Sequence, residues 1–480
     1  MHVLFDARLL HRPLSGLERV QRNLLRELGR HPRVDRLRVV LRHGTELPAT
    51  FPQRAEPVFV HGTEDILREL LQPETRPDVY HLSWFPDRNP RDLWLPLAAK
   101  ASVVEVHDAI LNRHPEYHPN HECWKWYHAF VRALVHGADR LLCHSRSVIE
   151  EVVRDLGGER ARCDLAPLAV EPTLRTPLAA DDARARRQRL GVPDRYLLAV
   201  GKDYPHKGHA TLFRAIARLR QQVPVVCAGS QVWHGTGSTR ELLAGLGMTK
   251  QVQWLEGLGD DDVKALLQGA TALVYPSSEE GFGLPPIEAM ALGTPVLAAA
   301  AMSIPEVCGD GAWLFPPDDV GALAALLQRV QHEPAQVAEL VARGRAREAT
   351  FSWQRCADAT VECYGRAIGK AGKGRAGKRR RAALPPDVLG ALLVQAQSPF
   401  RVERELAAWQ ERCLSVENTL RETLERLRAL EPDQTPRPPA PAPAPPDAGP
   451  PPPPAAAPRF SLTRRMRKIR DRLLGRGTPT

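Results

Sequence analysis

The chain has 480 residues and a formal net charge of +10 at pH 7, from 66 lysines and arginines against 56 aspartates and glutamates. This length exceeds one ordinary domain and is enough for two full cores. The eight cysteines form no CxxC pair, no apolar run approaches membrane-spanning length, and the opening MHVLFDARLL lacks the pattern of a signal peptide. These features argue against a disulfide framework, a cysteine zinc site and a transmembrane helix. We therefore expect a cytoplasmic protein with anionic partners.

The first 175 residues alternate short apolar runs with longer amphipathic stretches. The predicted strands are HVLFDA, LRVVLRH, DVYHLSW, SVVEVHDA and DRLLCHS. Helical patterns cover residues 17–28 and the stretch HECWKWYHAFVRALVHGA. This alternation predicts a parallel sheet with helices on both faces.

A second series begins after a charged, alanine-rich helix at residues 179–189. Its predicted strands are YLLAVG, VPVVCAG, VQWLEG, ALVYPSS, TPVLAAA and AWLF. Its predicted helices are TLFRAIARLRQQ, TRELLAGLG, DDVKALLQGA and PIEAMALG. The sequence thus predicts an α/β protein with two Rossmann-like domains, residues 1–175 and 176–350, facing a cleft. One more helix, SWQRCADATVECYGRAI in the segment 351–369, is expected to close this region.

The C-terminal part of the chain changes in composition. Residues 370–400 begin with the basic run KAGKGRAGKRRR and are interpreted as a linker. Within residues 401–431, apolar side chains from Val402 to Leu430 repeat at spacings of four and three for about four heptads. This pattern predicts a coiled coil or helical hairpin, which could join copies of the chain through residues 402–430. The alternative is one amphipathic helix that packs on the globular body.

The last two segments suggest a terminal helix that a spacer separates from the rest of the chain. Residues 432–458 are rich in proline and alanine and predict an extended spacer. In the predicted helix 459–476, four apolar side chains share one face, namely Leu462, Met466, Ile469 and Leu473. A basic amphipathic helix of this kind is typical of contact with an anionic membrane surface, at about 1 kcal/mol per charge. The alternatives are a solvated charged helix and a nucleic-acid tail; we favour the membrane and expect no nucleic-acid partner.

The stretch SSEEGFGLPPIEAMALGTPVLA, residues 277–298, places two glutamates beside a glycine loop and a helix start. It follows the predicted strand ALVYPSS, and open α/β sheets bind ligands at such strand ends. Gly281 and Gly283 let the backbone approach a ligand, and the helix start offers N–H groups to an anion. Because carboxylates do not bind phosphate directly, we expect Glu280 and Glu288 to accept hydrogen bonds from sugar and ribose hydroxyls. The pattern fits a nucleotide sugar lying over the loop.

Cations for the phosphates follow another predicted strand end. In AVGKDYPHKGH, Lys202 and Lys207 lie five residues apart across a turn. Two ammonium groups can neutralise a diphosphate leaving group without a metal. The acidic runs at Asp181 and at residues 260–262 resemble a metal-binding DxD only superficially, because aspartates there precede or begin helices. No metal and no other cofactor are therefore expected.

These residues together resemble the retaining glycosyltransferases of family four, also called glycosyl transferases group 1, which have the GT-B fold. The family's two glutamates, separated by seven residues, match Glu280 and Glu288 within EGFGLPPIEAMALGTPV. The resemblance covers about residues 1–368. Its other matches are the SGxxR residues Ser15, Gly16 and Arg19, the HD pair His107 and Asp108, the basic pair Lys202 and Lys207, and Glu306 in PEV. The first of the basic pair is more often arginine in the family.

The resemblance implies a role for each matched residue. Glu280 contacts the donor sugar, Glu288 holds the ribose, and His107 reaches the transferred sugar from the other domain. The implied catalytic residues are His107, Glu280 and Lys207. The implied donor-binding residues are Gly16, Lys202, Lys207, Glu280, Gly281, Phe282, Gly283, Leu284 and Glu288. The family's usual route is same-face attack with retention of configuration, in which the leaving phosphate oxygen helps to take the acceptor's proton.

Some positions depart from the family or stay open. The family often has PNGVD after the strand between the domains, whereas residues 167–171 read PLAVE. Alanine adopts a positive φ less readily than glycine, so this loop is expected to differ on the acceptor side. His81, Ser83 and Trp84 either touch an acceptor or pack in the core or rim. His206 and His209 are interpreted as ordinary turn residues.

The sequence therefore predicts a metal-independent hexosyltransferase, peripheral on the inner face of the cytoplasmic membrane. We expect a nucleotide diphosphate sugar as donor and a membrane-associated glycan or glycolipid as acceptor, in cell-surface polysaccharide or lipopolysaccharide assembly. Mannose is favoured only by its frequency in the family. The alternatives are a GT-B nucleotide-sugar epimerase and a non-catalytic scaffold derived from a transferase. A dinucleotide-dependent oxidoreductase is disfavoured because no GxGxxG turn follows the first strand.

Overall fold

The computed structural model describes residues 1–11, 16–48, 50–74, 76–83, 90–219, 223–231 and 238–371. The predicted basic linker beyond Ala371, the heptad helix, the proline-rich spacer and the basic amphipathic helix lie outside these residues. Those four assignments therefore remain predictions. Within the described residues, none of the helices combines the length and the apolarity that crossing a bilayer requires.

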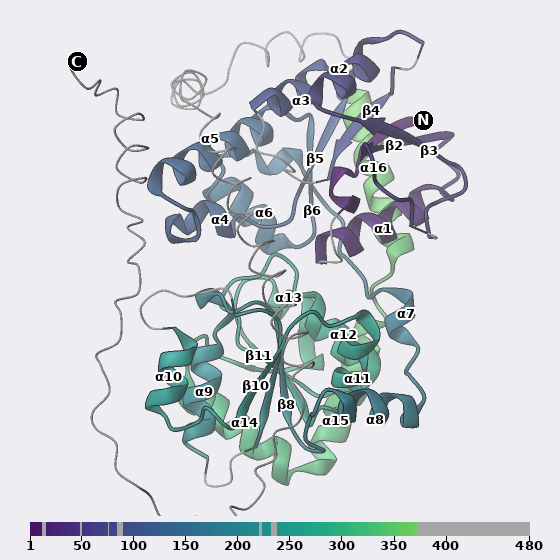
Figure 1. Cartoon of the computed structure of the whole chain (residues 1–480). Coiled ribbons are helices and arrows are strands. Elements are labelled where there is room, and N and C mark those ends of the chain that lie inside the picture. Colours follow the sequence, from purple (N-terminus) through teal and green to yellow (C-terminus); the bar gives the residue numbers. More distant parts are fainter. Residues whose placement is uncertain are drawn as a thin grey trace, which may run out of the picture. The chain divides into compact units, whose positions relative to one another are not determined.

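The N-terminal half is built on a parallel sheet of seven strands in the described residues, in the order β3-β2-β1-β4-β5-β6-β7 (Figure 1). The strands are β1 (His2–Asp6), β2 (Arg36–Arg42), β3 (Ala55–Val60), β4 (Val79–Leu82), β5 (Ser102–Val106), β6 (Arg140–Cys143) and β7 (Cys163–Leu165). Strands β3 and β7 were not predicted, because AEPVFV carries a proline and a glutamate and β7 is only three residues long. The five other strands match the predicted apolar runs.

The C-terminal half is built on a second parallel sheet, with six strands in the described residues in the order β10-β9-β8-β11-β12-β13. These are β8 (Leu197–Val200), β9 (Val225–Ala228), β10 (Val252–Leu255), β11 (Ala272–Tyr275), β12 (Val296–Ala299) and β13 (Trp313–Phe315). All six coincide with predicted strands. The expected α/β fold with two Rossmann-like halves is confirmed.

Helices cover the sheets of both halves. In the N-terminal half they are α1 (Gly16–Leu28), α2 (Thr63–Leu71), α3 (Trp94–Ala98), α4 (Ile110–Arg113), α5 (His121–Gly137) and α6 (Arg146–Arg154). The connection and the C-terminal half contain α7 (Pro172–Arg175), α8 (Ala180–Arg189), α9 (His209–Ala217), α10 (Thr239–Gly245), α11 (Asp260–Gly269), α12 (Leu284–Leu292), α13 (Ile304–Cys308), α14 (Val320–His332) and α15 (Pro334–Glu348). Local signals explain several ends: Asn120 and Ser145 cap α5 and α6, each accepting a backbone N–H.

The last described helix, α16 (Trp353–Ala371), returns to the N-terminal half. It packs against α1 and against strands β4, β5, β6 and β7 (Figure 1). Near its start, the Trp353 indole Nε1–H donates to the Val170 carbonyl at 3.1 Å, on the segment that joins the two sheets. This helix matches the predicted closing helix, and it places Tyr364 beneath the N-terminal sheet.

The core of each sheet follows from apolar runs that are buried on both faces, as expected for parallel strands covered by helices. Strand β5 (SVVEV) is buried at every position. Its buried charged residue is Glu105, a carboxylate with 0% relative exposure. Such a group requires compensation, because an unpaired buried charge is strongly unfavourable.

Candidate functional site

The strand order of the C-terminal sheet brings two predicted site loops together. The order reverses between the neighbouring strands β8 and β11, where Leu198 pairs with Leu273. Open α/β sheets bind ligands at the carboxyl ends of strands beside such a reversal. The loop after β8 carries Lys202 and Lys207, and the loop after β11 carries Glu280. The two segments, far apart in sequence, therefore reach one edge of the sheet.

Glu280 and Lys207 meet directly. Lys207 Nζ donates to Glu280 Oε1 at 2.7 Å, and the Tyr275 hydroxyl donates to the same oxygen at 2.6 Å. Burial opposes the charge on Glu280, but Lys207 and the hydrogen bonds outweigh it, so the pKa of Glu280 is lowered. Glu280 is therefore a carboxylate at neutral pH and can accept hydroxyl hydrogen bonds.

Two serine hydroxyls hold the glycine loop after Glu280 through hydrogen bonds to its backbone carbonyl groups. The Ser303 hydroxyl lies 2.8 Å from the Glu280 carbonyl oxygen and 3.1 Å from that of Phe282. From the other half, the Ser145 hydroxyl donates to the Gly281 carbonyl at 2.6 Å. Within the part of the chain that the structure describes, the N–H groups of Gly281, Phe282 and Gly283 have no acceptor. Three adjacent N–H groups of this kind suit an oxygen-rich or anionic ligand.

Gly281 and Gly283 are required for different reasons. A Cβ at Gly281 would lie 1.8 Å from the carbonyl oxygen of His107, so the two backbones approach too closely for any side chain. Gly283 has φ +88° and precedes α12, whose first turn holds Pro285 and Pro286. A left-handed residue followed by prolines at the helix start explains where this loop ends.

The second glutamate of the motif lies on α12 and faces a residue from α1. Glu288 Oε1 accepts from Arg19 Nη1 at 3.3 Å, and the Glu288 side chain is only 5% exposed. Arg19 Nη2 also donates to Asp260, and Arg19 Nε lies 3.9 Å from Glu171 Oε2. Burial raises the pKa of Glu288 above its usual value, although Arg19 acts in the opposite sense.

His107 lies past the end of β5, beside the glycine loop. Its Nε2 is 3.0 Å from the Ser83 carbonyl oxygen, and burial lowers the pKa of His107 to about 4. The imidazole is therefore neutral at pH 7, and its Nε2–H donates to the carbonyl. The structure thus brings His107, Glu280 and Lys207 to one region, as the resemblance implied.

The other implied donor residues lie in the loops after β8 and β11 and at the first residues of α1 and α12. Lys202 is exposed, and Gly16 is the exposed first residue of α1 with nothing within 4 Å of an added Cβ. Leu284 is the first residue of α12. The Phe282 side chain packs edge-on against Phe351, so its backbone is the part that can face a ligand. Ser15 lies outside the described residues.

Several interpretations of single residues can now be compared with the structure. His81 and Ser83 are both 0% exposed, which favours core packing over contact with an acceptor, and Trp84 is not among the described residues. His206 is more than a turn residue, because its Nδ1 lies 2.9 Å from the Tyr117 hydroxyl of the other half. Burial lowers the pKa of His206 to about 4. His209 is buried as well, at 3% exposure.

Two further expectations concern the acidic runs and the PLAVE loop. Asp261 and Asp262 bind arginines of α8, with Asp262 Oδ1 2.8 Å from Arg189 Nη2 and 3.0 Å from Arg186 Nη1. These pairs account for the aspartates without a metal. Among the described non-glycine residues, positive φ occurs at Met302 and Asp318, so Ala169 has an ordinary φ. Whether this loop differs in shape from that of the family stays a prediction.

Sequence reasoning missed the residues that join the two halves around this site. Arg113 Nη2 donates to Glu279 Oε2 at 2.5 Å, and its Nη1 lies 2.5 Å from Glu151 Oε1. His114 Nε2 lies 2.8 Å from Glu279 Oε1. Tyr275 and Ser303 were also missed, although Tyr275 ends its predicted strand just before the motif. The adjacent Arg113 and His114 carry no sequence signal for partners 165 and 166 residues away.

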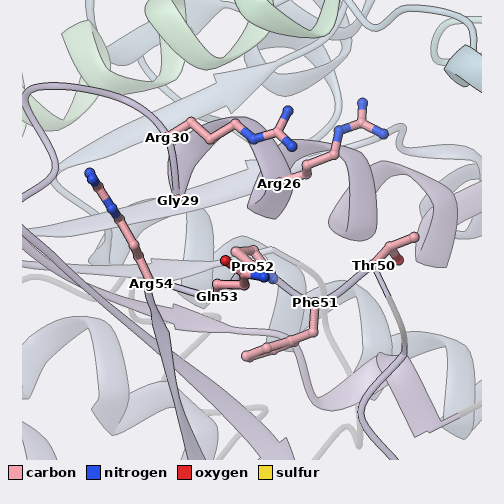
Figure 2. A pocket seen from close by; sticks show the side chains of 8 residues that line it. All are labelled: Arg26, Gly29, Arg30, Thr50, Phe51, Pro52, Gln53 and Arg54. Atoms are coloured by element: carbon pink, nitrogen blue, oxygen red, sulfur yellow. The ribbon is translucent and has the colours of Figure 1, made fainter.

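A separate pocket of about 620 Å³ lies between α1 and the segment before β3. Figure 2 shows Arg26 and Arg30 on one side of it and Arg54 on the other, with Phe51 and Pro52 at its base. It lies where α1 ends and β3 begins, at the amino ends of the strands. The predicted site residues follow carboxyl ends, so this basic pocket is not the candidate site.

Comparison with known proteins agrees with this geometry. Residues 182–347 match the family model described as glycosyl transferases group 1, and the chain has the GT-B fold. The MMP α-(1→4)-mannosyltransferase of Mycolicibacterium hassiacum is 35% identical over 253 residues, 51% of this chain and 59% of that protein. The O-antigen chain mannosyltransferase B of Escherichia coli is 26% identical over 394 residues, 76% of this chain and 99% of that protein.

The aligned part spans only 59% and 55% of the first two curated relatives, the second being a D-inositol 3-phosphate glycosyltransferase of Salinispora arenicola. Among solved structures, HepE of Anabaena in complex with UDP and glucose superposes with a TM-score of 0.59 at 20% identity, over 76% of this chain and 99% of that one. Sucrose-phosphate synthase of Thermosynechococcus elongatus superposes with a TM-score of 0.60 at 18% identity, over 77% of this chain and 99% of that one. These likenesses support the fold.

Proposed function

We propose that this protein is a glycosyltransferase that moves a hexose from a nucleotide diphosphate sugar to a glycan or glycolipid acceptor. The observation that carries this proposal is the Lys207–Glu280 pair beside three N–H groups without a described acceptor. A carboxylate, an ammonium and a backbone anion site at one strand end match the hydroxyls and phosphates of such a donor. The match of residues 182–347 to the glycosyl transferases group 1 model supports the same proposal.

The proposed donor contacts follow from the hydrogen-bonding capacity of each group. An ammonium has three donors, and Lys207 uses one on Glu280, which leaves two for the diphosphate. Lys202, exposed in the same loop, adds a second cation. Glu280 Oε1 already accepts two bonds, so its Oε2 is the oxygen for a sugar hydroxyl. Glu288 would hold the ribose, sharing its carboxylate with Arg19.

The proposed reaction needs no resident cofactor. The bond from the sugar's anomeric carbon to the diphosphate oxygen breaks, and a bond to the acceptor oxygen forms on the same face. The acceptor's proton passes to the leaving phosphate oxygen, and the two lysines stabilise the charge that develops there. His107, on the opposite loop, would position the transferred sugar. Retention of configuration is part of this proposal.

Mannose is the proposed sugar because two relatives are named as mannosyltransferases. The proposed acceptor is an intermediate of cell-surface polysaccharide or lipopolysaccharide, as in the name of the Escherichia coli relative. The basic segment 459–476 would keep the enzyme on the inner face of the cytoplasmic membrane, where such acceptors reside.

The experiment that tests this function is nucleotide release from a panel of UDP-, GDP- and TDP-sugars, with and without a membrane glycolipid extract. We expect release from one donor, increased by the extract and coupled to incorporation of the sugar into glycolipid. NMR of the anomeric proton in the product then tests retention. A donor sugar converted to an isomer without any acceptor would instead indicate an epimerase.

Membrane contact has its own test in the full-length chain. Replacing Arg464, Arg465 and Arg467 by glutamine should reduce sedimentation with vesicles that contain anionic phospholipid, while leaving release from the soluble donor unchanged. The matched control replaces three exposed arginines of the globular part, Arg184, Arg195 and Arg240. Equal sedimentation of all three proteins would contradict the proposed contact.

A further inference from the structure

Four ionisable side chains from three neighbouring strands meet inside the N-terminal half. Glu105 lies in β5, His107 follows that strand, and His81 and His144 lie in or just after β4 and β6 on either side. Their placement is deep: His81 and Glu105 are 0% exposed and His144 is 1% exposed. His107 also lies beside the donor site, but that site does not explain the burial of Glu105, His81 and His144.

The side-chain atoms are close enough to share one ion. His144 Nε2 lies 2.8 Å from Glu105 Oε1, and His81 Nε2 lies 3.3 Å from Glu105 Oε2. His107 Nε2 lies 3.8 Å from Glu105 Oε1. The ligand atoms of Glu105, His107 and His144 all lie within 4.8 Å of one another. Ligands held at about 2.0–2.2 Å from a tetrahedral Zn²⁺ are themselves about 3.3 Å apart.

Despite these short distances, the atoms do not form aligned hydrogen bonds. His81 Nε2, His144 Nε2 and both carboxylate oxygens of Glu105 are buried without a hydrogen-bond partner. Buried polar atoms nearly always have a partner, and exceptions can indicate an ion or a water. Imidazole nitrogens and carboxylate oxygens that lie this close together without an assigned hydrogen bond are suited to share a common ion.

The far sides of two rings show the supporting contacts that metal-binding imidazoles make. His144 Nδ1 lies 2.8 Å from the Ala166 carbonyl oxygen, so this nitrogen carries the proton and Nε2 keeps its lone pair. His81 Nδ1 lies 2.6 Å from the hydroxyl of Tyr364 on α16. Partners of this kind fix the tautomer and the orientation of ligating histidines.

The chemistry of the side chains in the cluster also suits a cation. Imidazole nitrogens with one carboxylate are a donor set that suits zinc.

We propose that Glu105, His107 and His144 bind one zinc ion. Coordination would move His107 Nε2 from the Ser83 carbonyl, now 3.0 Å away, to the ion. The three ligands would tie β5 to the segment after β6 and fix the His107 ring, and the site does not depend on the proposed function.

The metal content of the untagged, full-length protein tests this site. After expression with added zinc and gel filtration, elemental analysis should find about one zinc per chain. Glu105→Gln and His144→Gln should each contain at least about tenfold less zinc per chain than the wild type. Glutamine at position 105 keeps the size of the side chain, and circular dichroism checks that the variants fold. The matched control is His31→Gln, which removes another buried histidine, one that lies 3.1 Å from Asp358, and should keep the zinc.

A second measurement on the wild type covers the case in which a variant fails to fold. Protein stripped with a chelator should take up Co²⁺, develop the visible absorption of a tetrahedral site and gain thermal stability. A wild type with neither zinc nor a cobalt spectrum would overturn the proposal, and the cluster would then be a buried imidazolium–carboxylate pair. Zinc that persists in Glu105→Gln would also overturn it. None of these readouts uses a sugar donor, so they are independent of the transferase assay.

Discussion

Lys207 and Glu280 form an ion pair at 2.7 Å although 73 residues separate them in the chain. The pair exists because β8 and β11 are neighbours in the sheet, so that the loops after them lie side by side. Tyr275, the last residue of β11, adds its hydroxyl to the same carboxylate oxygen. Consequently Lys207 and Glu280 are not isolated charges. Each holds the other in place, so a change in either residue should alter how both contact the donor.

Glu280→Gln should abolish most turnover while the protein stays folded. The amide has the same shape but cannot balance Lys207 or accept as strongly from a sugar hydroxyl, so we expect a loss on the order of 10²-fold in kcat for nucleotide release. Tyr275→Phe removes one hydrogen bond to the same charged oxygen and should cost about 1.5 kcal/mol, or about tenfold in kcat. Wild-type kcat in Glu280→Gln would contradict the assigned role.

Gly281→Ala should damage the contact between the halves. The added Cβ would lie 1.8 Å from the His107 carbonyl oxygen, a distance that forces either the loop or β5 to move. We expect a fall in thermal unfolding temperature together with weaker nucleotide-sugar binding, measured by scanning calorimetry and titration calorimetry. The control is Gly245→Ala, where nothing lies within 4 Å of the added Cβ. Equal behaviour of the two variants would show that the loop adapts freely.

His114 should make stability depend on pH above neutrality. Burial alone lowers the pKa of His114, but hydrogen bonds with Glu116 at 2.7 Å and Glu279 at 2.8 Å outweigh it and raise the pKa above 6.5. A raised histidine pKa gives stability that is complete below the unfolded value and is lost as pH rises through the folded value.

The wild type should therefore lose more stability than His114→Gln between pH 6 and pH 8.5. We expect a difference of only about 1–2 °C in unfolding temperature, because solvent screens the exposed part of the ring. The measurement is a thermal scan of both proteins at the two pH values in one buffer system. A parallel decline of the two proteins would mean that the His114 contacts contribute nothing.

The sequence predicted the parts of this molecule that depend on local patterns. Apolar runs between helical stretches located eleven of the strands described here, and Pro285, Pro286 and Gly293 marked the ends of α12. The edge strands β3 and β7 were not predicted, because AEPVFV carries a glutamate and a proline and β7 has only three residues. Length, composition and spacing thus give the fold where each element is long or buried.

Contacts between distant segments were beyond such reasoning. Nothing in the sequence tells that Arg113 meets Glu279 or that Ser145 holds Gly281, because these pairs depend on how two sheets face each other. The Glu105 cluster did carry a signal. Glu105 and His107 share a strand face at a spacing of two, and His81 and His144 stand at the ends of the predicted strands on either side. Recognising it required the strand order β4-β5-β6.

The stability of the fold should depend on Arg19, because Arg19 compensates the buried carboxylate of Glu288. Arg19→Met removes the guanidinium that lies 3.3 Å from Glu288 and also serves Asp260 and Glu171. We expect a loss of about 2 kcal/mol in the free energy of unfolding at pH 8, less than for a fully buried pair because 17% of the Arg19 side chain is exposed.

The loss in Arg19→Met should shrink at pH 5. Burial already raises the pKa of Glu288, and removing Arg19 raises it further, so protonation relieves the buried charge as pH falls. The double variant Arg19→Met, Glu288→Leu should recover most of the stability at pH 8, because two apolar side chains replace a charge pair. Urea unfolding of the wild type, the single variant and the double variant at both pH values measures this. If Arg19→Met unfolds like the wild type at pH 8, Glu288 is compensated by another group, and Arg19 is then available for the donor rather than committed to stability.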